Sequence, residues 1–530
     1  MSKEEGGAYV RRASGLIREI SGWDALMYNM ASMGVLFVLI YTTWGLALYP
    51  GANLPLTALI AIPLGLPLAL TYALFSIAMP RSGGDYVWIS RVLHPALGFM
   101  INFSLVFVLL VAIGIEPSWA LQYGIAPLLQ SLSIVYGDPG LASLANTVSS
   151  PEFVTVVGLV YFILIGLALT RRPRTIMKIK WVLFTITILG ALAYLVGLLS
   201  AGTQTFISNF NSMSGMKYDE VIKAAVKEGY PSTFLWAATM LGIVYTFLNL
   251  IGYVFSSYIG GEVKEAQKSQ LISMTGALII FALLMFVVYQ VTFSVMGGEF
   301  VGGISYLAET GSKAYTLPFP EPFPHTLLVY ATSNPVILAL ANIGVAITPL
   351  LAGFAYIFLI TRNIFAWAFD RVVPTSLSKV DEKYGSPYVT TILVIILAMI
   401  FQALWLYTTV FQFVLYITTI IFIGYVVTGI TAIIFPYKRK DIYEASPKIV
   451  RSKIGGIPVI SILGLLTTII SAFVVYATLT PTLGGIMDPN ALFLNMLVYP
   501  VALIIFAIAY VYRKKTGIPL EYSFKEVPPV

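Results

Sequence analysis

The 530-residue sequence contains no cysteine and only two histidines, and just 10% of its residues are charged. The absence of cysteine excludes disulfide bonds and thiolate metal sites. A soluble protein of this length needs far more charge to cover its surface, whereas a surface in contact with lipid needs none. Together with a hydrophobic content of 58% and a mean hydropathy of +0.87, this scarcity of charge indicates a polytopic membrane protein.

Several functional signals are also missing from the sequence. No glycine-rich phosphate loop ending in Gly-Lys-Ser/Thr occurs, which indicates that this chain alone does not drive transport with ATP. His94 and His325 have no partners at a metal-ligand spacing, so we expect no metal site, no cofactor, no catalytic residues and no enzyme activity. The polar N-terminus lacks the short apolar core of a signal peptide.

Apolar runs of about 17–25 residues, the length that crosses a hydrocarbon core, recur along the whole chain. They predict an all-α polytopic fold with twelve membrane helices. The first six are Ala25–Tyr49, Leu54–Met79, Leu97–Leu121, Phe153–Leu169, Trp181–Leu199 and Phe234–Tyr258. The second six are Leu271–Met296, Pro335–Phe365, Tyr388–Leu406, Phe411–Phe435, Val459–Leu479 and Leu492–Tyr512.

The basic residues alternate between the predicted loops. All but four of the 31 Lys and Arg lie in the two tails and in every second loop, and we expect none inside a helix. The four exceptions are Lys217, Lys223, Lys227 and Lys313. Because cytoplasmic loops carry the excess of basic residues, both termini are predicted to lie in the cytoplasm, with the protein in the cell membrane. This asymmetry also explains the net charge of +7 without nucleic-acid binding.

Two of the apolar runs contain residues that interrupt a helix. The first run groups Asn29, Ala31, Ser32 and Gly34 near its centre, and the sixth reads FLNLIGYVFSSYIGGEV. Irregular backbone at membrane depth is tolerated where it is buried or lines a cavity, so broken helices indicate a binding site. Alternatively, small residues merely let helices pack closely. Because five is odd, helices one and six have opposite orientations, as in a five-plus-five inverted repeat.

Three loop motifs resemble those of amino acid–polyamine–organocation (APC) transporters. They are PRSGGDYVWISRVLHPALGF from Pro80 to Phe99, GGEVKEAQK after the sixth run, and RNIFAWAFDRVVPTSLSKVDEKYGSPYV from Arg362 to Val389. The resemblance implies an amino acid permease-like transporter with a LeuT-like fold. Helices one to five and six to ten would form the inverted repeats, and the last two helices would be accessory.

The resemblance also implies a division of the chain. It comprises a cytoplasmic tail (1–22), the first repeat (23–200), an extracellular loop (201–232), the second repeat (233–436), a cytoplasmic loop (437–456), two accessory helices (457–512) and a C-terminal tail (513–530).

The resemblance places a substrate at the two interruptions. In helix one, N–H groups of an unwound segment would bind a substrate carboxylate, and the residues are Ala31, Ser32, Met33 and Gly34. In helix six, freed carbonyls would bind the amino group, and the residues are Leu248, Asn249, Ile251 and Gly252. Phe247, Tyr253 and Phe255 are gate candidates, although plain packing against lipid or helices explains each of them as well.

Glu116 is the one carboxylate expected within a membrane helix. It is either solvated at the outer interface or lies in the outer vestibule, where it would favour a cationic substrate or exchange a proton. Many proton-coupled relatives carry a lysine in helix five, and none is expected here. Thr185, Thr187 and Thr348 are alternative ligands for Na⁺, although membrane threonines more often bond their own backbone. The coupling ion therefore stays open.

These observations predict a secondary active transporter that moves an amino acid or related organic amine by alternating access. Coupling to H⁺ or exchange is expected, and Na⁺ symport is the alternative. An amine-gated channel or a membrane solute sensor is the alternative of another class. The expected partners are the solute, the lipid bilayer and H⁺ or Na⁺, and the oligomeric state stays open.

Overall fold

The structure, a computed structural model, describes residues 15–381, 383–408, 415–480, 489–517, 520 and 523–524. The predicted N-terminal tail up to residue 14, the first residues of the tenth predicted helix and most of the predicted C-terminal tail lie outside these ranges. Within the described residues, twelve helices are long and apolar enough to cross a membrane. This confirms the predicted all-α polytopic fold.

Several of the twelve spans consist of more than one element. The first six spans are α1 (Gly22–Met33) with α2 (Phe37–Leu48); α3 (Leu54–Ala78); α5 (Pro95–Trp119) with η1 (Ala120–Ile125) and α6 (Ala126–Tyr136); α8 (Pro151–Leu169); α9 (Pro173–Met213); and α11 (Trp236–Leu250) with η2 (Ile251–Tyr258). The others are α12 (Ala266–Thr292) with η4 (Phe293–Gly297) and α13 (Gly298–Glu309); α15 (Pro335–Phe369); α16 (Tyr388–Tyr407); α17 (Leu415–Lys438); α19 (Val459–Leu479); and α20 (Pro489–Met496) with α21 (Val498–Lys515).

Shorter elements connect the spans. They are α4 (Asp85–Val92), α7 (Pro139–Val148), α10 (Tyr218–Lys227), η3 (Gly260–Glu262), α14 (Pro324–Leu327), η5 (Leu328–Tyr330), η6 (Thr375–Ser378), α18 (Lys440–Ala445), and the two-stranded antiparallel hairpin of β1 (Lys453–Ile454) and β2 (Ile457–Pro458).

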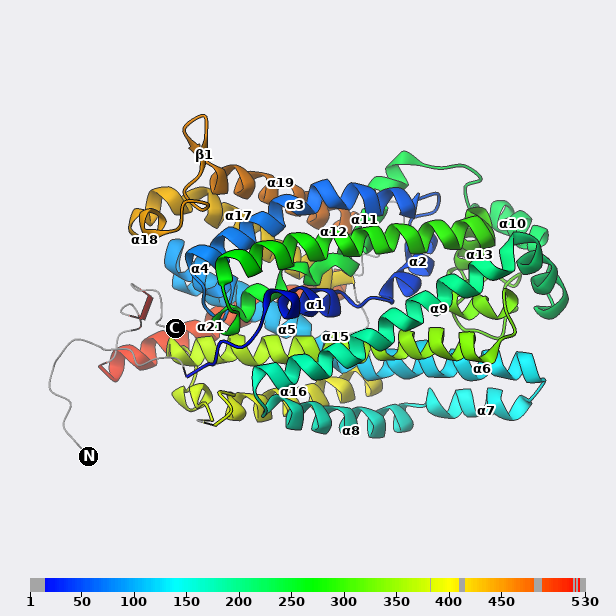
Figure 1. The fold of residues 1–530 in the computed structure, drawn as a ribbon, viewed down its shortest axis with the longest axis horizontal. Helices are drawn as coiled ribbons and strands as arrows, with labels where there is room; N and C mark the ends of the chain where they lie inside the picture. The colour runs from blue at the N-terminus through cyan, green and yellow to red at the C-terminus, as the bar shows by residue number, and fades with distance from the viewer. Residues whose placement is uncertain are drawn as a thin grey trace.

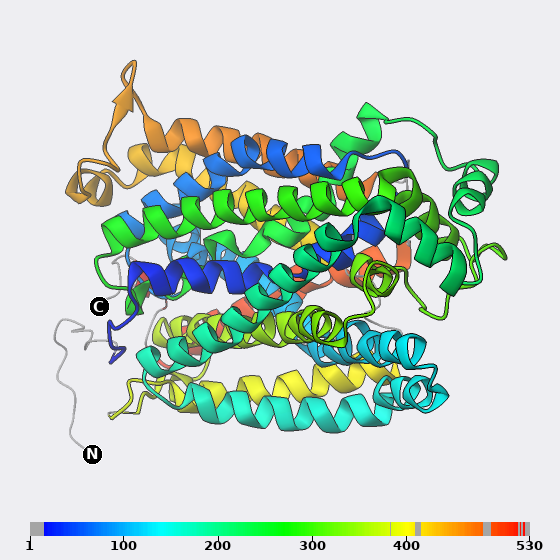
Figure 2. The ribbon, with the colours of Figure 1, turned by 45° about the vertical axis from the view of Figure 1, so that its right-hand side comes forward.

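The long helices run roughly along the long axis of the molecule, which therefore has two distinct ends (Figure 1). One end carries α18 and the β1–β2 hairpin, and we refer to it as the α18 end. The opposite end carries α6, α7, α10 and α13, and we refer to it as the α10 end. Figure 2 shows α3 and α19 along one side of the bundle and α8 and α16 along the other.

The first, sixth and eighth spans lie at the centre of this bundle. Nearly all of α1, α2, α11, η2 and α15 is buried, whereas α21 and α8 expose most of their residues. Exposed apolar side chains on the outer helices are what a lipid-facing surface requires. The interrupted helices are therefore enclosed by the other spans.

The segment expected as an extracellular loop at 201–232 is largely helical. Helix α9 continues to Met213, with a kink at Gly202, where φ is 71°, and α10 follows it. At 1.5 Å per residue, the part of α9 from Pro173 to the kink at Gly202 alone extends about 44 Å, beyond a hydrocarbon core of about 30 Å. The helices at the α10 end therefore continue past the membrane.

Local sequence explains where the central helices begin. Ser21 and Asp24 form a capping box at the start of α1, with each side chain bonded to the other residue's backbone N–H. Asn53 caps α3 and His94 caps α5, each followed by a proline in the first helical turn.

Candidate functional site

Two interrupted helices meet at the centre of the bundle. Helix α1 ends at Met33, Gly34 adopts a φ of 71°, and α2 resumes at Phe37. In the sixth span, the α-helix ends at Leu250 and a 3₁₀ helix follows from Ile251 to Tyr258. Both interruptions therefore occur within a few residues of the sequence positions expected to be unwound.

The two interruptions are in direct backbone contact. A Cβ atom built on Gly252 would lie 2.6 Å from the carbonyl carbon of Ser32 and 2.8 Å from the nitrogen of Met33. Real Cβ atoms do not approach backbone so closely, so this contact requires glycine. Asn29 fastens the same interface, because its side chain accepts a 2.7 Å hydrogen bond from the Ser256 N–H.

Side chains already bond the carbonyls that the interruptions release. Asn249 donates to the carbonyl of Met33 at 2.7 Å. Tyr356 donates to the carbonyl of Ser32 at 2.7 Å, and Tyr425 donates to that of Ile251 at 2.9 Å. These bonds satisfy backbone groups that lipid cannot solvate.

The N–H groups between α1 and α2 remain open. Within the described part of the chain, the N–H groups of Val35 and Leu36 form no backbone hydrogen bond, whereas the Gly34 N–H bonds to Ala31. Open N–H groups at the start of a helix are suited to an anion. They lie just after the residues expected from the sequence, because the left-handed Gly34 first closes α1.

A small buried cavity adjoins the two interruptions. Its volume is about 30 Å³, enough for about one water molecule. Its walls come from five different spans and are mainly aliphatic and aromatic. The lining residues are Met33, Phe37, Tyr41, Ala112, Ile115, Glu116, Trp119, Leu248, Ile251, Tyr356 and Ile417.

Glu116 is the charged side chain of this cavity. It is 4% exposed, and its Oε2 atom has no hydrogen-bond partner among the described residues. It packs closely against α15, since a Cβ atom on Gly353 would lie 3.2 Å from the Glu116 Cγ. The carboxyl group is thus inside the bundle, next to the helix interruptions, and not in solvent at an interface.

The structure distributes the sequence-predicted substrate residues over two groups. Met33, Leu248, Ile251 and Glu116 line the cavity itself. The remaining residues form the interruptions beside it without lining it, and they are Ala31, Ser32, Gly34, Asn249 and Gly252.

The three gate candidates do not line the cavity. Phe247 packs on Phe422 with ring centroids 5.6 Å apart, and Phe255 packs on Tyr258 and Tyr356. Tyr253 donates a 3.1 Å hydrogen bond to the carbonyl of Gly65. Their placement fits the packing role that the sequence also allowed.

Other aromatic residues cover the cavity toward the α10 end. They form a continuous cluster of ring contacts, and its members are Phe37, Tyr41, Trp44, Trp119, Tyr123 and Phe323. We refer to these six residues as the aromatic cover. Sequence reasoning missed them, because they come from three distant segments and no local pattern joins them.

The loop after α13 holds the aromatic cover in place. Thr43 donates to the carbonyl of Pro322, and the Nε2 atom of His325 lies 2.7 Å from the carbonyl oxygen of Tyr123. Burial lowers the pKa of His325 to about 4, so its ring is neutral at pH 7 and Nε2 donates this bond. This Pro-rich loop therefore packs against the aromatic cover.

Charged groups close the bundle toward the α18 end. Arg362 Nε lies 2.9 Å from Glu262 Oε1, and both side chains are fully buried. Lys180 is also fully buried, with its ammonium nitrogen 4.5 Å from the ring centroid of Tyr28 and 4.8 Å from that of Phe358. These contacts connect α1, α9, η3 and α15.

The positions of Lys180 and Arg362 correct the sequence analysis. The expectation that no Lys or Arg lies inside a membrane helix is wrong, because both residues are interior to long helices. Helix α9 therefore does carry a lysine beside α1. The sequence analysis missed this lysine because α9 begins at Pro173, eight residues before the predicted start of this span at Trp181.

The three threonines proposed as ion ligands all bond their own helices. Thr187 donates to the carbonyl of Phe184, and Thr348 donates to that of Gly344. Thr185 is exposed and donates to the carbonyl of Trp181. The structure therefore does not bring Thr185 together with the other two.

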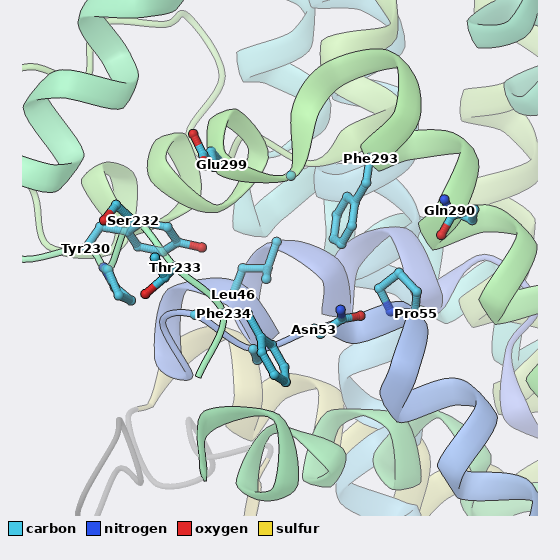
Figure 3. Close-up of a pocket in the computed structure, with 14 residues that line it drawn as sticks. Leu46, Asn53, Pro55, Tyr230, Ser232, Thr233, Phe234, Gln290, Phe293 and Glu299 are labelled. Atoms are coloured by element: carbon cyan, nitrogen blue, oxygen red, sulfur yellow. The ribbon is translucent and has the colours of Figure 1, made fainter. Parts of the chain in front are cut away.

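A larger cavity of about 280 Å³ lies at the α10 end (Figure 3). Figure 3 shows Tyr230, Ser232 and Thr233 on one side of it and Gln290, Phe293 and Pro55 on the other. None of its lining residues belongs to either helix interruption. The smaller central cavity is therefore the better candidate site, because there the interruptions, Glu116 and the aromatic cover converge.

Comparison with known proteins agrees with this geometry. The sequence matches the family described as amino acid permease over residues 20–509. It is 23% identical to the branched-chain amino acid permease BcaP of Bacillus subtilis (strain 168) over 383 residues, which are 71% of this chain and 72% of that protein. It is also 23% identical to the branched-chain amino acid permease BcaP of Lactococcus lactis subsp. cremoris (strain MG1363) over 325 residues, which are 59% of this chain and 60% of that protein. Because the family match extends over nearly the whole chain, this protein belongs to the amino acid permease family.

Proposed function

We propose that this permease is a secondary active transporter that moves amino acids with apolar side chains across the cell membrane by alternating access. The observation that carries the proposal is the meeting of two interrupted helices beside a buried, mainly apolar cavity. In this proposal the α10 end faces outward, and the two sets of five spans act as inverted repeats.

The open N–H groups support a pose for the substrate. Its carboxylate accepts hydrogen bonds from Val35 and Leu36 at the start of α2, where the helix dipole favours negative charge. Its amino group faces carbonyls of the helix-six interruption, whose second lone pairs are available beside the existing bonds. Met33, Ile115 and Ile417 then surround the side chain.

The cavity favours aliphatic side chains over charged ones. Its walls offer many carbon atoms and a single carboxyl group, Glu116. The two similar permeases from Bacillus and Lactococcus are named for branched-chain amino acids, in keeping with such walls. Since about 30 Å³ is too small for an amino acid, binding must move the walls apart.

Coupling to protons fits the buried groups better than coupling to Na⁺. Glu116 and Lys180 are buried ionisable side chains on opposite sides of the interruptions, and each has a polar atom without a hydrogen bond within the described chain. By contrast, Thr185 is exposed whereas Thr187 and Thr348 are buried, so the three threonines do not form one Na⁺ site. Exchange of one amino acid for another needs neither ion and remains within the proposal.

Uptake by purified protein in liposomes tests the function. We expect saturable uptake of labelled leucine, isoleucine or valine, with competition by apolar amino acids and stimulation by an inward proton gradient. Stimulation by a Na⁺ gradient without stimulation by a proton gradient would show Na⁺ symport instead of proton coupling. Binding without uptake would support a sensor instead, and unitary currents without saturable uptake would support a channel.

A further inference from the structure

A cavity at the α18 end lies apart from the central site. It has a volume of about 560 Å³ and is bounded by the turn between α4 and α5, the end of α17 and the last turns of α21. Leu520 and Phe524, which follow α21, complete its wall. None of its lining residues belongs to the helix interruptions or to the aromatic cover.

One wall of this cavity is apolar and adjoins the lipid-facing surface. Phe506, Tyr510 and Val511 line it from α21. Neighbouring side chains of the same helix face outward, with Ile504 and Ile508 59% and 65% exposed. An acyl chain lying along α21 therefore reaches the cavity without leaving the hydrocarbon region.

The opposite wall comes from α4, the turn after it and the end of α17, and it is basic. Arg91 is 5% exposed, and its Nε atom has no hydrogen-bond partner among the described residues. Its terminal nitrogens are already occupied, since Nη1 and Nη2 lie 2.7 and 2.8 Å from the Asp370 carboxylate oxygens. The Arg91 side chain itself has no exposed surface, so its ion-paired guanidinium lies behind this wall without reaching the cavity.

Lys438 and His94 are exposed and supply the hydrogen-bond donors of this wall. The Lys438 ammonium donates to the carbonyl of Leu93 at 3.0 Å, which leaves two of its three protons available. His94 accepts the Ala96 N–H at Nδ1, so Nε2 carries the ring proton and is free to donate. No Asp or Glu lines this cavity within the described chain.

We propose that this cavity binds an anionic phospholipid. The phosphate group accepts hydrogen bonds from the Lys438 ammonium and His94 Nε2, and an acyl chain lies against Phe506 and Val511. A basic pocket beside an exposed membrane helix at the predicted cytoplasmic side suits an acidic lipid headgroup. The ligand needs a phosphate group to contact the basic wall and a hydrocarbon chain to contact the apolar wall.

An occupied site would stabilise a connection between distant helices. Arg91 belongs to α4, and its ion-pair partner Asp370 directly follows α15, the helix that packs against Glu116. A phosphate held by Lys438 and His94 would join the end of α17 to the turn that directly follows α4. Lipid binding is therefore expected to raise the thermal stability of the folded protein.

Lipid retention by the purified full-length protein tests this proposal without requiring transport. Protein in detergent is mixed with equal amounts of phosphatidylglycerol and phosphatidylcholine, repurified, and analysed for bound lipid. We expect several-fold enrichment of phosphatidylglycerol and a matching upward shift of Tm. Lys438→Gln should reduce the enrichment at least threefold, and Ala507→Trp should reduce retention of both lipids by filling the apolar wall.

Lys448→Gln is the matched control, because Lys448 is an exposed lysine near the same end that does not line the cavity. It removes the same charge and should leave lipid retention unchanged. Equal retention of the two lipids by the unaltered protein would overturn the proposal, as would unchanged enrichment in Lys438→Gln. If millimolar inorganic phosphate displaces the lipid or reproduces the Tm shift by itself, the ligand is a free anion and the lipid assignment fails.

Discussion

Single residues determine how closely the interrupted helices approach each other. Gly252 lies against the backbone of Ser32 and Met33, so no side chain fits between η2 and the end of α1. Gly34 ends α1 in a left-handed conformation that favours glycine. These two glycines act through different physical requirements, one through space and the other through backbone dihedral angles.

We expect Gly252→Ala to lower substrate affinity and uptake at least tenfold. The added methyl group must displace backbone, and overpacking of this kind typically costs about 1–3 kcal/mol. Equilibrium binding and liposome uptake of labelled leucine measure the effect. Gly298→Ala is the control, because a Cβ atom there meets its nearest neighbour at an ordinary 3.7 Å. Wild-type affinity in folded Gly252→Ala protein would contradict the proposed site.

At this scale, local composition predicted the interruptions well and the tertiary contacts poorly. The interruptions around Gly34 and Gly252 can be predicted from the sequence because helix-breaking residues are rare within apolar runs. The burial of Lys180 could not be predicted in this way, because a charged residue next to the end of an apolar run has the same sequence pattern as a charged loop residue. Partners such as Tyr356 and Tyr425 act from other helices, and no spacing in one sequence reveals them.

Among the connecting elements, the loop between α13 and α15 is placed to regulate access to the cavity. Phe323 belongs to the aromatic cover, and Thr43 bonds the carbonyl of Pro322. Burial, followed by the neighbouring Glu309 carboxylate, raises the pKa of Glu321 in this loop from 4.5 to about 7. The Glu321 carboxyl group therefore holds its proton more tightly in the closed loop than in an opened, solvated loop.

This difference gives loop opening a defined pH dependence. The closed loop is most favoured below about pH 4.5, where Glu321 is protonated in both states. The free-energy difference that favours the closed loop over the open loop falls as the pH rises from about 4.5 to about 7, and it is constant above that value. We expect Glu321→Gln to remove this dependence.

A single cysteine at Ala112, in the cavity wall, reports loop opening through its reaction with a membrane-impermeant thiol reagent. Its rate is divided by that of a single cysteine at the exposed Ser232, which corrects for thiol ionisation. The ratio should rise between about pH 5 and 7 and then level off, and it should stay flat in Glu321→Gln. The same slope in both proteins would exclude Glu321 as the titrating group.

For elements, hydropathy sufficed to predict the twelve spans, whereas it failed for their extensions. Helices α9 and α13 continue beyond the apolar runs, and the short amphipathic helix α10 packs on α13 through its buried Val221 and Ala225. Such helices depend on tertiary contacts and carry no hydrophobic signal of membrane length.

The whole molecule is asymmetric in charge, and this asymmetry predicts its orientation. The α18 end carries Lys438, Arg439 and the basic last turn of α21, whereas four of the 31 Lys and Arg, namely Lys217, Lys223, Lys227 and Lys313, lie in the alternate set of loops. Because the chain has no cysteine, single substitutions can report topology directly. An impermeant maleimide should label Ser232→Cys in intact cells. It should label Ser452→Cys only after the cells have been permeabilised. The reverse pattern would invert the proposed orientation.

The small size of the central cavity has a further consequence for the cell. A space for about one water molecule, covered by aromatic rings on one side and by buried ion pairs on the other, cannot hold a continuous file of water. Without such a file, neither protons nor metal ions find a hydrated route across the bilayer. If the proposed transport mechanism holds, the closed, empty protein should conduct no ions, and it can be produced in large amounts without dissipating the membrane potential.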